Sequence, residues 1–138
     1  MTPTFKLVRL APPISDFIEL RNQVGWGKID VQLATKSLEN SLFHVSVYDQ
    51  SKLVGAGRVI GDGYMYFYIQ DVIVDPRYQG KGVGSLLMNE IALYLAKTTS
   101  TGSTVGLLAA KGKESFYLKY GYLERTGNPL GNGMCKFI

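Results

Sequence analysis

The sequence predicts one domain with a mixed α/β fold, and three observations predict it. Apolar residues recur with a period of two between residues 42 and 74, which is typical of half-buried strands. After residue 74, segments with helical and strand patterns alternate, which favours helices packed on a sheet. The chain has 138 residues, of which 46% are hydrophobic, so residues 1–138 are expected to form a single domain.

The N-terminal segment is expected to form a strand followed by a short helix. In Thr4–Leu10, alternate positions are apolar, which indicates a strand. The next segment, residues 12–27, has apolar residues at helical spacing. Ser15 or Asp16 can cap the start of this helix, and Gly25 is a natural end for it.

The middle of the chain is expected to form a second helix and then three strands. Asp30 can cap a helix that runs to Leu38. The alternating segments LFHVSVYD and LVGAGRVI flank a DQSK turn, which predicts a hairpin over residues 42–60. A third strand is expected at Tyr64–Val74. Three strands joined by short turns give an antiparallel meander.

The C-terminal half is expected to add two helices and two strands. Residues 82–97 have the apolar spacing of a helix, and TVGLLAA at Thr104–Ala110 has the composition of a buried strand. KESFYLKY at residues 113–120 predicts a short helix that ends at Gly121. A last strand is expected at Gly133–Ile138.

Composition excludes several classes of protein. The net charge of +4 comes from 15 basic and 11 acidic residues spread along the chain, so no nucleic-acid partner is expected. Cys135 is the single cysteine, which excludes an intrachain disulfide and a zinc site with several thiolates, and no metal is expected. No apolar run approaches the roughly 20 residues that cross a bilayer, so we expect a cytoplasmic protein without a membrane partner.

A glycine-rich segment, QGKGVG at residues 79–84, lies between a predicted strand and a predicted helix. Glycines let the backbone approach a ligand, and the first turn of a helix offers unpaired N–H groups to an anion. A tight turn without a ligand explains the glycines alone equally well. The spacing excludes a Walker loop, because Gly82 follows Lys81 where a hydroxyl residue is required, and it excludes the dinucleotide fingerprint.

Two motifs together resemble the GCN5-related N-acetyltransferases, the GNAT superfamily. They are Q-x-x-G-x-G at Gln79, Gly82 and Gly84, which follows a hydrophobic strand, and FYLKYGY at Phe116–Tyr122. The resemblance implies a GNAT fold, with a central mixed and mostly antiparallel sheet flanked by about four helices. It also implies a splayed pair of parallel strands that binds coenzyme A (CoA).

The resemblance implies acetyl-CoA as co-substrate and assigns the residues that bind it. The exposed edge of the strand would pair with the pantetheine arm, and the glycine-rich loop would hold the pyrophosphate. The amide of Val72 would polarise the thioester carbonyl. The cofactor-binding residues implied are Val72, Ile73, Val74, Gln79, Gly80, Lys81, Gly82, Val83, Gly84 and Ser85.

Tyr117 and Asp71 are the candidate catalytic residues. Tyr117 aligns with the family's tyrosine that protonates the departing thiolate, and a phenol is protonated at neutral pH. Asp71 could take the amine proton through water, or it could be a structural carboxylate bonded to a cation such as Arg58. Further candidates for the base are Glu114, Asp62 and Asp30, and the amine can also lose its proton to solvent.

Three features carry less weight or depart from the family pattern. Ala110 stands where many relatives have a CoA-contacting asparagine, so that contact must be absent or replaced by a nearby lysine. His44 has no second histidine or cysteine near it and is expected to be structural. Cys135 is expected to be a packed thiol rather than a nucleophile.

The sequence therefore predicts an acetyl-CoA-dependent N-acetyltransferase that acetylates a primary amine of a small molecule by direct attack. VGW, GAGR, DVIV and a late GM resemble a branch that includes serotonin N-acetyltransferases of plants and cyanobacteria, which favours an arylalkylamine acceptor. The alternatives are an acetyltransferase for protein lysines or N-termini and a non-catalytic sensor of acyl-CoA. A homodimer is compatible with the fold.

Overall fold

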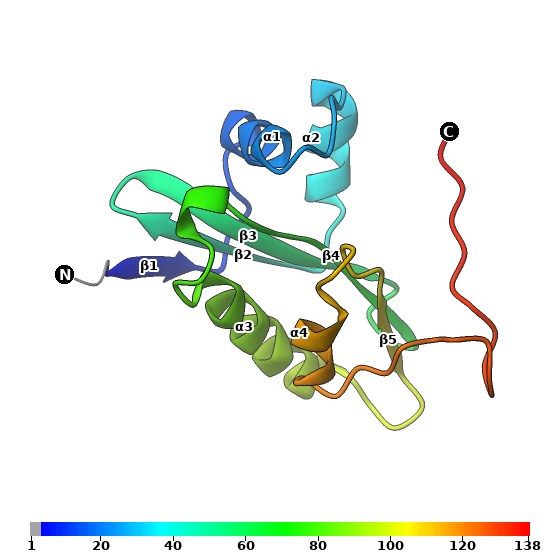
Figure 1. Cartoon of the computed structure of the whole chain (residues 1–138). Helices are drawn as coiled ribbons and strands as arrows, with labels where there is room; N and C mark the ends of the chain where they lie inside the picture. The colour runs from blue at the N-terminus through cyan, green and yellow to red at the C-terminus, as the bar shows by residue number, and fades with distance from the viewer. Residues whose placement is uncertain (1–3) are drawn as a thin grey trace. The chain divides into compact units, whose positions relative to one another are not determined.

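A computed structural model describes residues 4–138, which divide into a first compact unit ending at Gly106 and a second at Leu107–Ile138 (Figure 1). The elements, in chain order, are β1 (Phe5–Val8), α1 (Ile14–Gln23), α2 (Val31–Glu39), β2 (Phe43–Asp49), β3 (Lys52–Gly61), β4 (Tyr66–Val74), the 3₁₀ turn η1 (Pro76–Tyr78), α3 (Val83–Thr98), β5 (Thr104–Leu107) and α4 (Glu114–Leu118).

The sheet has the strand order β1-β2-β3-β4-β5, and β1 to β4 form an antiparallel meander. β5 begins beside the start of β4, because the Thr104 N–H donates to the Met65 carbonyl over 2.7 Å. Two residues farther along, Gly106 faces Tyr68, so β4 and β5 run in the same direction. The predicted mixed and mostly antiparallel sheet is confirmed.

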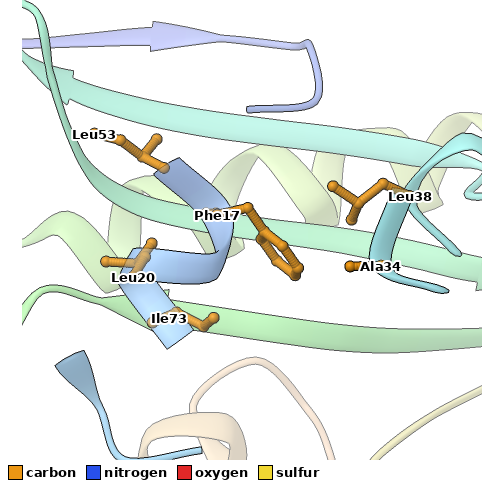
Figure 2. Close-up of a cluster of buried hydrophobic side chains, with 7 residues drawn as sticks. Phe17, Leu20, Ala34, Leu38, Leu53 and Ile73 are labelled. Atoms are coloured by element: carbon orange, nitrogen blue, oxygen red, sulfur yellow. The ribbon is translucent and has the colours of Figure 1, made fainter. Parts of the chain in front are cut away.

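Helices α1 and α2 cover one face of this sheet through a cluster of buried apolar side chains. Figure 2 shows members of the cluster from both helices converging on the strands. The buried members are Phe17, Leu20, Ala34, Leu38, Leu53, Ala56 and Ile73. Successive strand residues point to opposite faces, so the neighbours of Ala56 are available to the other side of the sheet.

Helix α3 packs on that other face, where β3 offers two glycines. An ideal Cβ at Gly55 would lie 2.6 Å from Cγ1 of Val83, and one at Gly57 would lie 3.1 Å from Cδ1 of Ile91. The helix buries Val83, Leu87, Met88, Ile91 and Leu95, which recur at helical spacing. The glycines of the GAGR segment thus allow α3 to lie close to the sheet. In residues 4–138, no helix is both long and apolar enough to cross a membrane.

Two capping predictions have different outcomes. The Asp30 side chain caps α2 as predicted, accepting a 2.9 Å hydrogen bond from the Leu33 N–H. The predicted cap of α1 at Ser15 or Asp16 is wrong, because the helix already begins at Ile14, with Pro13 at the capping position and no side-chain cap. The Phe17 N–H donates to the Pro13 carbonyl, so Ser15 and Asp16 already lie within the first turn of the helix and not at its cap.

The third strand begins two residues later than predicted. β4 starts at Tyr66 because the Asp62 carboxylate accepts the N–H groups of Tyr64, Met65 and Tyr66 over 2.9–3.0 Å. These hydrogen bonds hold the residues after Gly61 in a turn. A side chain with three local backbone partners therefore replaces the first part of the predicted strand.

In the second unit, the short helix α4 forms as predicted, and Phe116 makes edge-to-face ring contacts with Tyr117 and Tyr120. The predicted strand at Gly133–Ile138 is wrong, because these residues have no regular secondary structure. Cys135, predicted to be packed, is exposed. Apolar residues that suit a strand form one only where a neighbouring strand supplies hydrogen-bond partners.

Candidate active site

The glycine-rich segment connects η1 to α3 through two glycines in the left-handed region. Gly80 has φ +78° and Gly82, at the N-cap of α3, has φ +86°. Within residues 4–138, and apart from the chain neighbours of each glycine, no atom lies within 4 Å of a Cβ built on Gly80 or Gly82, so both backbone segments border open space. Because only glycine adopts such φ values without strain, the segment needs these residues for its chain path.

The first turn of α3 offers N–H groups to an anion beside this loop. The first intrahelical bond of α3 runs from the Leu86 N–H to the Gly82 carbonyl, so the N–H groups of Val83, Gly84 and Ser85 precede it. Gly82 supplies no side chain to cap them. Donors at a helix N-terminus favour negative charge, and a pyrophosphate fits this donor set.

Two lysines lie near Tyr78: Lys81 belongs to the glycine-rich segment, and Lys52 is the first residue of β3. The Nζ atoms of Lys81 and Lys52 each lie 5.4 Å from the centre of the Tyr78 ring. The Tyr78 hydroxyl donates a 2.6 Å hydrogen bond to Asp49, and this bond raises the pKa of the phenol. Lys81 therefore stays beside the glycines, where its charge can move onto a phosphate.

Asp75 anchors the chain between β4 and the loop. Its carboxylate is 1% exposed and pairs with Arg77 at 3.1 Å and with Lys52 at 3.4 Å. Burial acts to raise the pKa of Asp75, but hydrogen bonds from the side chain and N–H of Arg77 and from Lys52 outweigh it and lower the pKa. The charged carboxylate thus fixes the turn that leads to Gln79.

A β-bulge lies in β4 at the residues predicted to face the thioester. The register pairs Ala56 with Ile73 and Arg58 with Gln70, so Gly57 faces both Asp71 and Val72. Asp71 has φ +56°, a left-handed value that is uncommon for a residue with a side chain. A bulge leaves one residue outside the ladder and bends its strand, so β4 departs from regular pairing at Asp71–Val72.

The Asp71 side chain is enclosed by cations. It is 2% exposed, its Oδ2 accepts a 2.8 Å hydrogen bond from Arg58, and its Oδ1 accepts bonds from Arg21 at 3.2 Å and from Gln70 at 3.1 Å. The sequence left this carboxylate open as a base or as a structural partner of Arg58. The pairing with Arg58 and Arg21 is the arrangement that the second alternative describes.

Tyr117 lies on α4, in the second unit, whereas the bulge and the glycine-rich loop lie in the first. Burial raises the pKa of the Tyr117 phenol above its usual value of 10.0. The hydroxyl therefore keeps its proton throughout the neutral range. A protonated phenol is the form that a general acid requires.

Sequence reasoning missed Arg21, which links the Asp71 carboxylate to the connection between α1 and α2. The Arg21 guanidinium lies 5.4 Å from the ring centre of Trp26 and 6.0 Å from that of Phe17. One signal in the sequence could have indicated Arg21: it is a cation one helical turn after Phe17, on the apolar side of α1. His44, predicted to be structural, contacts the Leu38 carbonyl through Nε2 at 2.8 Å.

Comparisons with known proteins give the family of the chain. The sequence model of the acetyltransferase (GNAT) domain matches residues 39–124. A ycf52-like uncharacterized N-acetyltransferase of Prochlorococcus marinus is 36% identical over 122 residues, which cover 82% of this chain and 66% of that protein. The histone acetyltransferase TAP1 of Glycine max is 28% identical over 120 residues, which cover 79% of this chain and 51% of that protein. The chain spans about half to two thirds of the length of these curated relatives.

A solved structure has the same fold. It is a protein of unknown function from meticillin-resistant Staphylococcus aureus, named a probable acetyltransferase. It is 34% identical, has a TM-score of 0.89, and the match covers 97% of this chain and 100% of that chain. The chain therefore belongs to the GNAT acetyltransferase family and has its fold.

Proposed function

We propose that this protein is an acetyl-CoA-dependent N-acetyltransferase that acetylates a primary amine of a small molecule by direct attack. One observation carries the proposal. The loop with left-handed Gly80 and Gly82 leads into the open N-terminus of α3, and the short turn η1 joins it to the bulged strand β4. An anion seat and an irregular strand edge thus lie on consecutive segments of one chain.

The glycine-rich loop would bind the pyrophosphate of CoA. Backbone N–H groups at the start of α3 supply the donors, and Lys81 supplies a mobile charge. The proposed contacts come from Gln79, Gly80, Lys81, Gly82, Val83, Gly84 and Ser85. These residues bind a part of the molecule far from the reacting carbonyl, so they contribute mainly to affinity.

The strand β4 would orient the acetyl end. When bound, acetyl-CoA supplies an acetyl thioester with a carbon open to attack by an amine. Val72, Ile73 and Val74 offer backbone groups to the pantetheine arm as a neighbouring strand would. The Val72 N–H would donate a hydrogen bond to the thioester oxygen, where negative charge develops during attack.

Tyr117 would act as the general acid for the sulfur. Its pKa is raised by burial, so the phenol is fully protonated at neutral pH and can donate at the moment when the thiolate departs. Removal of the amine proton is assigned to solvent water, because both oxygens of Asp71 already accept hydrogen bonds from cations.

The proposed acceptor is a small amine with an aromatic side chain. Trp26, which is 38% exposed, lies on the connection that covers the acceptor site in the family and offers a ring face for stacking. The Glycine max relative named as a histone acetyltransferase favours a protein lysine as the second candidate acceptor.

The test is consumption of acetyl-CoA, followed as release of free thiol. The panel contains tryptamine, phenethylamine, spermidine and a lysine-containing histone-tail peptide. We expect turnover with an arylalkylamine and a large loss in the Tyr117→Phe variant. Turnover with the peptide alone would identify a protein acetyltransferase. Tight CoA binding without turnover on any amine would identify a non-catalytic acyl-CoA sensor and overturn the proposal.

A further inference from the structure

A buried cluster of charged side chains lies behind the β4 bulge, on the face of the sheet covered by α1 and α2. We call Arg21, Arg58 and Asp71 the bulge clamp. Their side chains are 18%, 10% and 2% exposed, so the cluster is largely removed from water. It joins α1, β3 and β4, which are separated by up to 50 residues in the sequence.

The clamp fixes the conformation of the bulged residue itself. A left-handed non-glycine residue persists only where its surroundings hold it there, and Asp71 is such a residue. Its carboxylate has hydrogen bonds from Arg58, Arg21 and Gln70, so the side chain cannot turn without breaking contacts in several directions. The backbone at Asp71 sets the direction of the next peptide group, whose N–H belongs to Val72.

The two arginines extend the clamp to the helices. Nη1 of Arg58 donates 3.0 Å hydrogen bonds to the Ser37 carbonyl and the Ser41 hydroxyl, at the end of α2. Arg21 reaches Trp26 through its guanidinium. The bulge is therefore tied to the end of α2 and to the connection between α1 and α2.

The cluster is poorly arranged as a source of stability. It holds two cations for one carboxylate, and Nε of Arg21 is buried without a hydrogen-bond partner in the part of the chain that the structure describes. Buried ion pairs contribute little net stability, and an unsatisfied buried donor costs free energy. A role in fixing the backbone of β4 at Asp71 accounts for the cluster better than a role in stabilising the fold.

We propose that the bulge clamp is a positioning device that aims the Val72 N–H at the thioester oxygen, and that Asp71 takes up no proton in the reaction. This inference rests on the proposed function. The groups that face Asp71 are Arg21 from α1, Arg58 from β3 and Gln70 from β4. His44 from β2 lies close enough to interact with the charges of Arg58 and Asp71. If Asp71 took up a proton, its carboxylate would lose a hydrogen bond from Arg21 or Arg58. We therefore assign Asp71 as a positioning residue.

The first experiment follows the Val72 amide by NMR in ¹⁵N-labelled protein. In the wild type, acetyl-CoA should shift this amide downfield more than CoA does, because only the thioester offers the oxygen. In Asp71→Asn and Arg58→Met, this difference should disappear, while the amides of Val83 and Gly84 still respond to both ligands. Arg9→Met, which breaks an exposed ion pair with Glu90, is the control and should behave as the wild type.

The second experiment compares kinetics, using the panel amine that turns over fastest. Asp71→Asn and Arg58→Met should lower kcat to a similar extent, by about 100-fold, because a small displacement of a catalytic donor has effects of that size. KM for acetyl-CoA and the shape of the pH–rate profile should not change. Arg21→Met, which keeps the inner Arg58–Asp71 pair, gives a milder variant with a smaller loss should the other two fold poorly.

The outcomes separate this inference from the proposed function. If Asp71→Asn alone loses activity together with the acidic limb of the pH–rate profile, while Arg58→Met stays active, Asp71 is a base and the inference is wrong. An unchanged Val72 shift in both clamp variants also overturns it. If the wild-type amides of Val83 and Gly84 ignore acetyl-CoA, the proposed function fails, and the inference fails with it.

Discussion

Gly55 of β3 lies directly against Val83, the first residue of α3, so closely that a Cβ on the glycine would lie 2.6 Å from Cγ1 of the valine. Val83 is 1% exposed and is β-branched, so its side chain has few alternative rotamers in a helix. The start of α3, and with it the proposed pyrophosphate seat, is therefore positioned by a missing side chain on the sheet.

The substitution Gly55→Ala should displace the start of α3. Overpacking of this kind costs about 1–3 kcal/mol of unfolding free energy, and CoA should bind more weakly because the N–H donors move. Gly57→Ala is the matched control, because its Cβ would meet the flexible end of Ile91 at 3.1 Å. Urea unfolding should place the control within about 1 kcal/mol of the wild type. Equal losses in the two variants would contradict this account of α3.

The Tyr117→Phe variant should lose turnover without losing CoA affinity. Loss of a general acid lowers kcat by about 10²- to 10⁴-fold. Because burial raises the pKa of Tyr117, the phenol in the wild type should remain active as pH rises through 10.0 and lose its proton only above that value. Tyr120→Phe, on the same segment, is the control and should retain full activity. A pH–rate profile that falls near neutrality in the wild type but not in Tyr117→Phe would assign the phenol another role.

His44 should make stability depend on pH in the range where imidazole titrates. Burial lowers its pKa below 6.5, the nearby Arg58 lowers it further, and the hydrogen bond to Leu38 opposes both. Because the unfolded chain binds this proton more readily, stability is complete above pH 6.5 and falls as pH decreases toward the folded pKa.

The His44→Gln variant tests that dependence cleanly, because His44 is the single histidine of the chain. Unfolding free energies from urea titrations between pH of about 5 and 8 should decline on the acidic side in the wild type and stay flat in the variant. A decline of the same steepness in both proteins would show that another group is responsible.

Asp75 should contribute to stability at every pH above the acid range. Burial opposes its charge, but hydrogen bonds from Arg77 and Lys52 lower the pKa below 3.8, so the contribution is present above that pH and is lost as pH falls through the folded pKa. Asp75→Asn should lower Tm at neutral pH. In a plot of Tm against pH, it should also make the decrease of Tm on the acidic side (the acid limb) less steep. Asp30→Asn, which keeps a good helix cap, should change neither. An acid limb as steep in Asp75→Asn as in the wild type would contradict the assignment.

Elements with local signals were predictable from the sequence. The hairpin of β2 and β3 follows from alternation around a short turn, and the Asp30 cap follows from a carboxylate before an apolar spacing. The glycine-rich loop was found because its glycines are needed for left-handed φ values that local sequence determines. These features depend on residues that are close together in the chain.

Features fixed by distant partners were not predictable. The left-handed Asp71 is paired with Arg58 and with Arg21, which lies 50 residues away, so the bulge has no local signature. The segment at Gly133–Ile138 has apolar residues that suit a strand but forms none. The sequence of a segment indicates whether its residues suit a strand, but the strand forms only if another segment of the chain pairs with it.

Calorimetric titration of CoA measures whether the loop at Gly82 binds the pyrophosphate, as proposed. Alanine at a left-handed position costs about 1–2 kcal/mol, and a Cβ built on Gly82 or Gly102 meets no atom within 4 Å in the described chain beyond the glycine's own neighbours. Gly82→Ala and Gly102→Ala should therefore lose similar stability. Gly82→Ala should bind CoA about tenfold more weakly, whereas Gly102→Ala should bind it as the wild type does. Equal CoA affinity in the wild type and both variants would contradict a pyrophosphate site at Gly82.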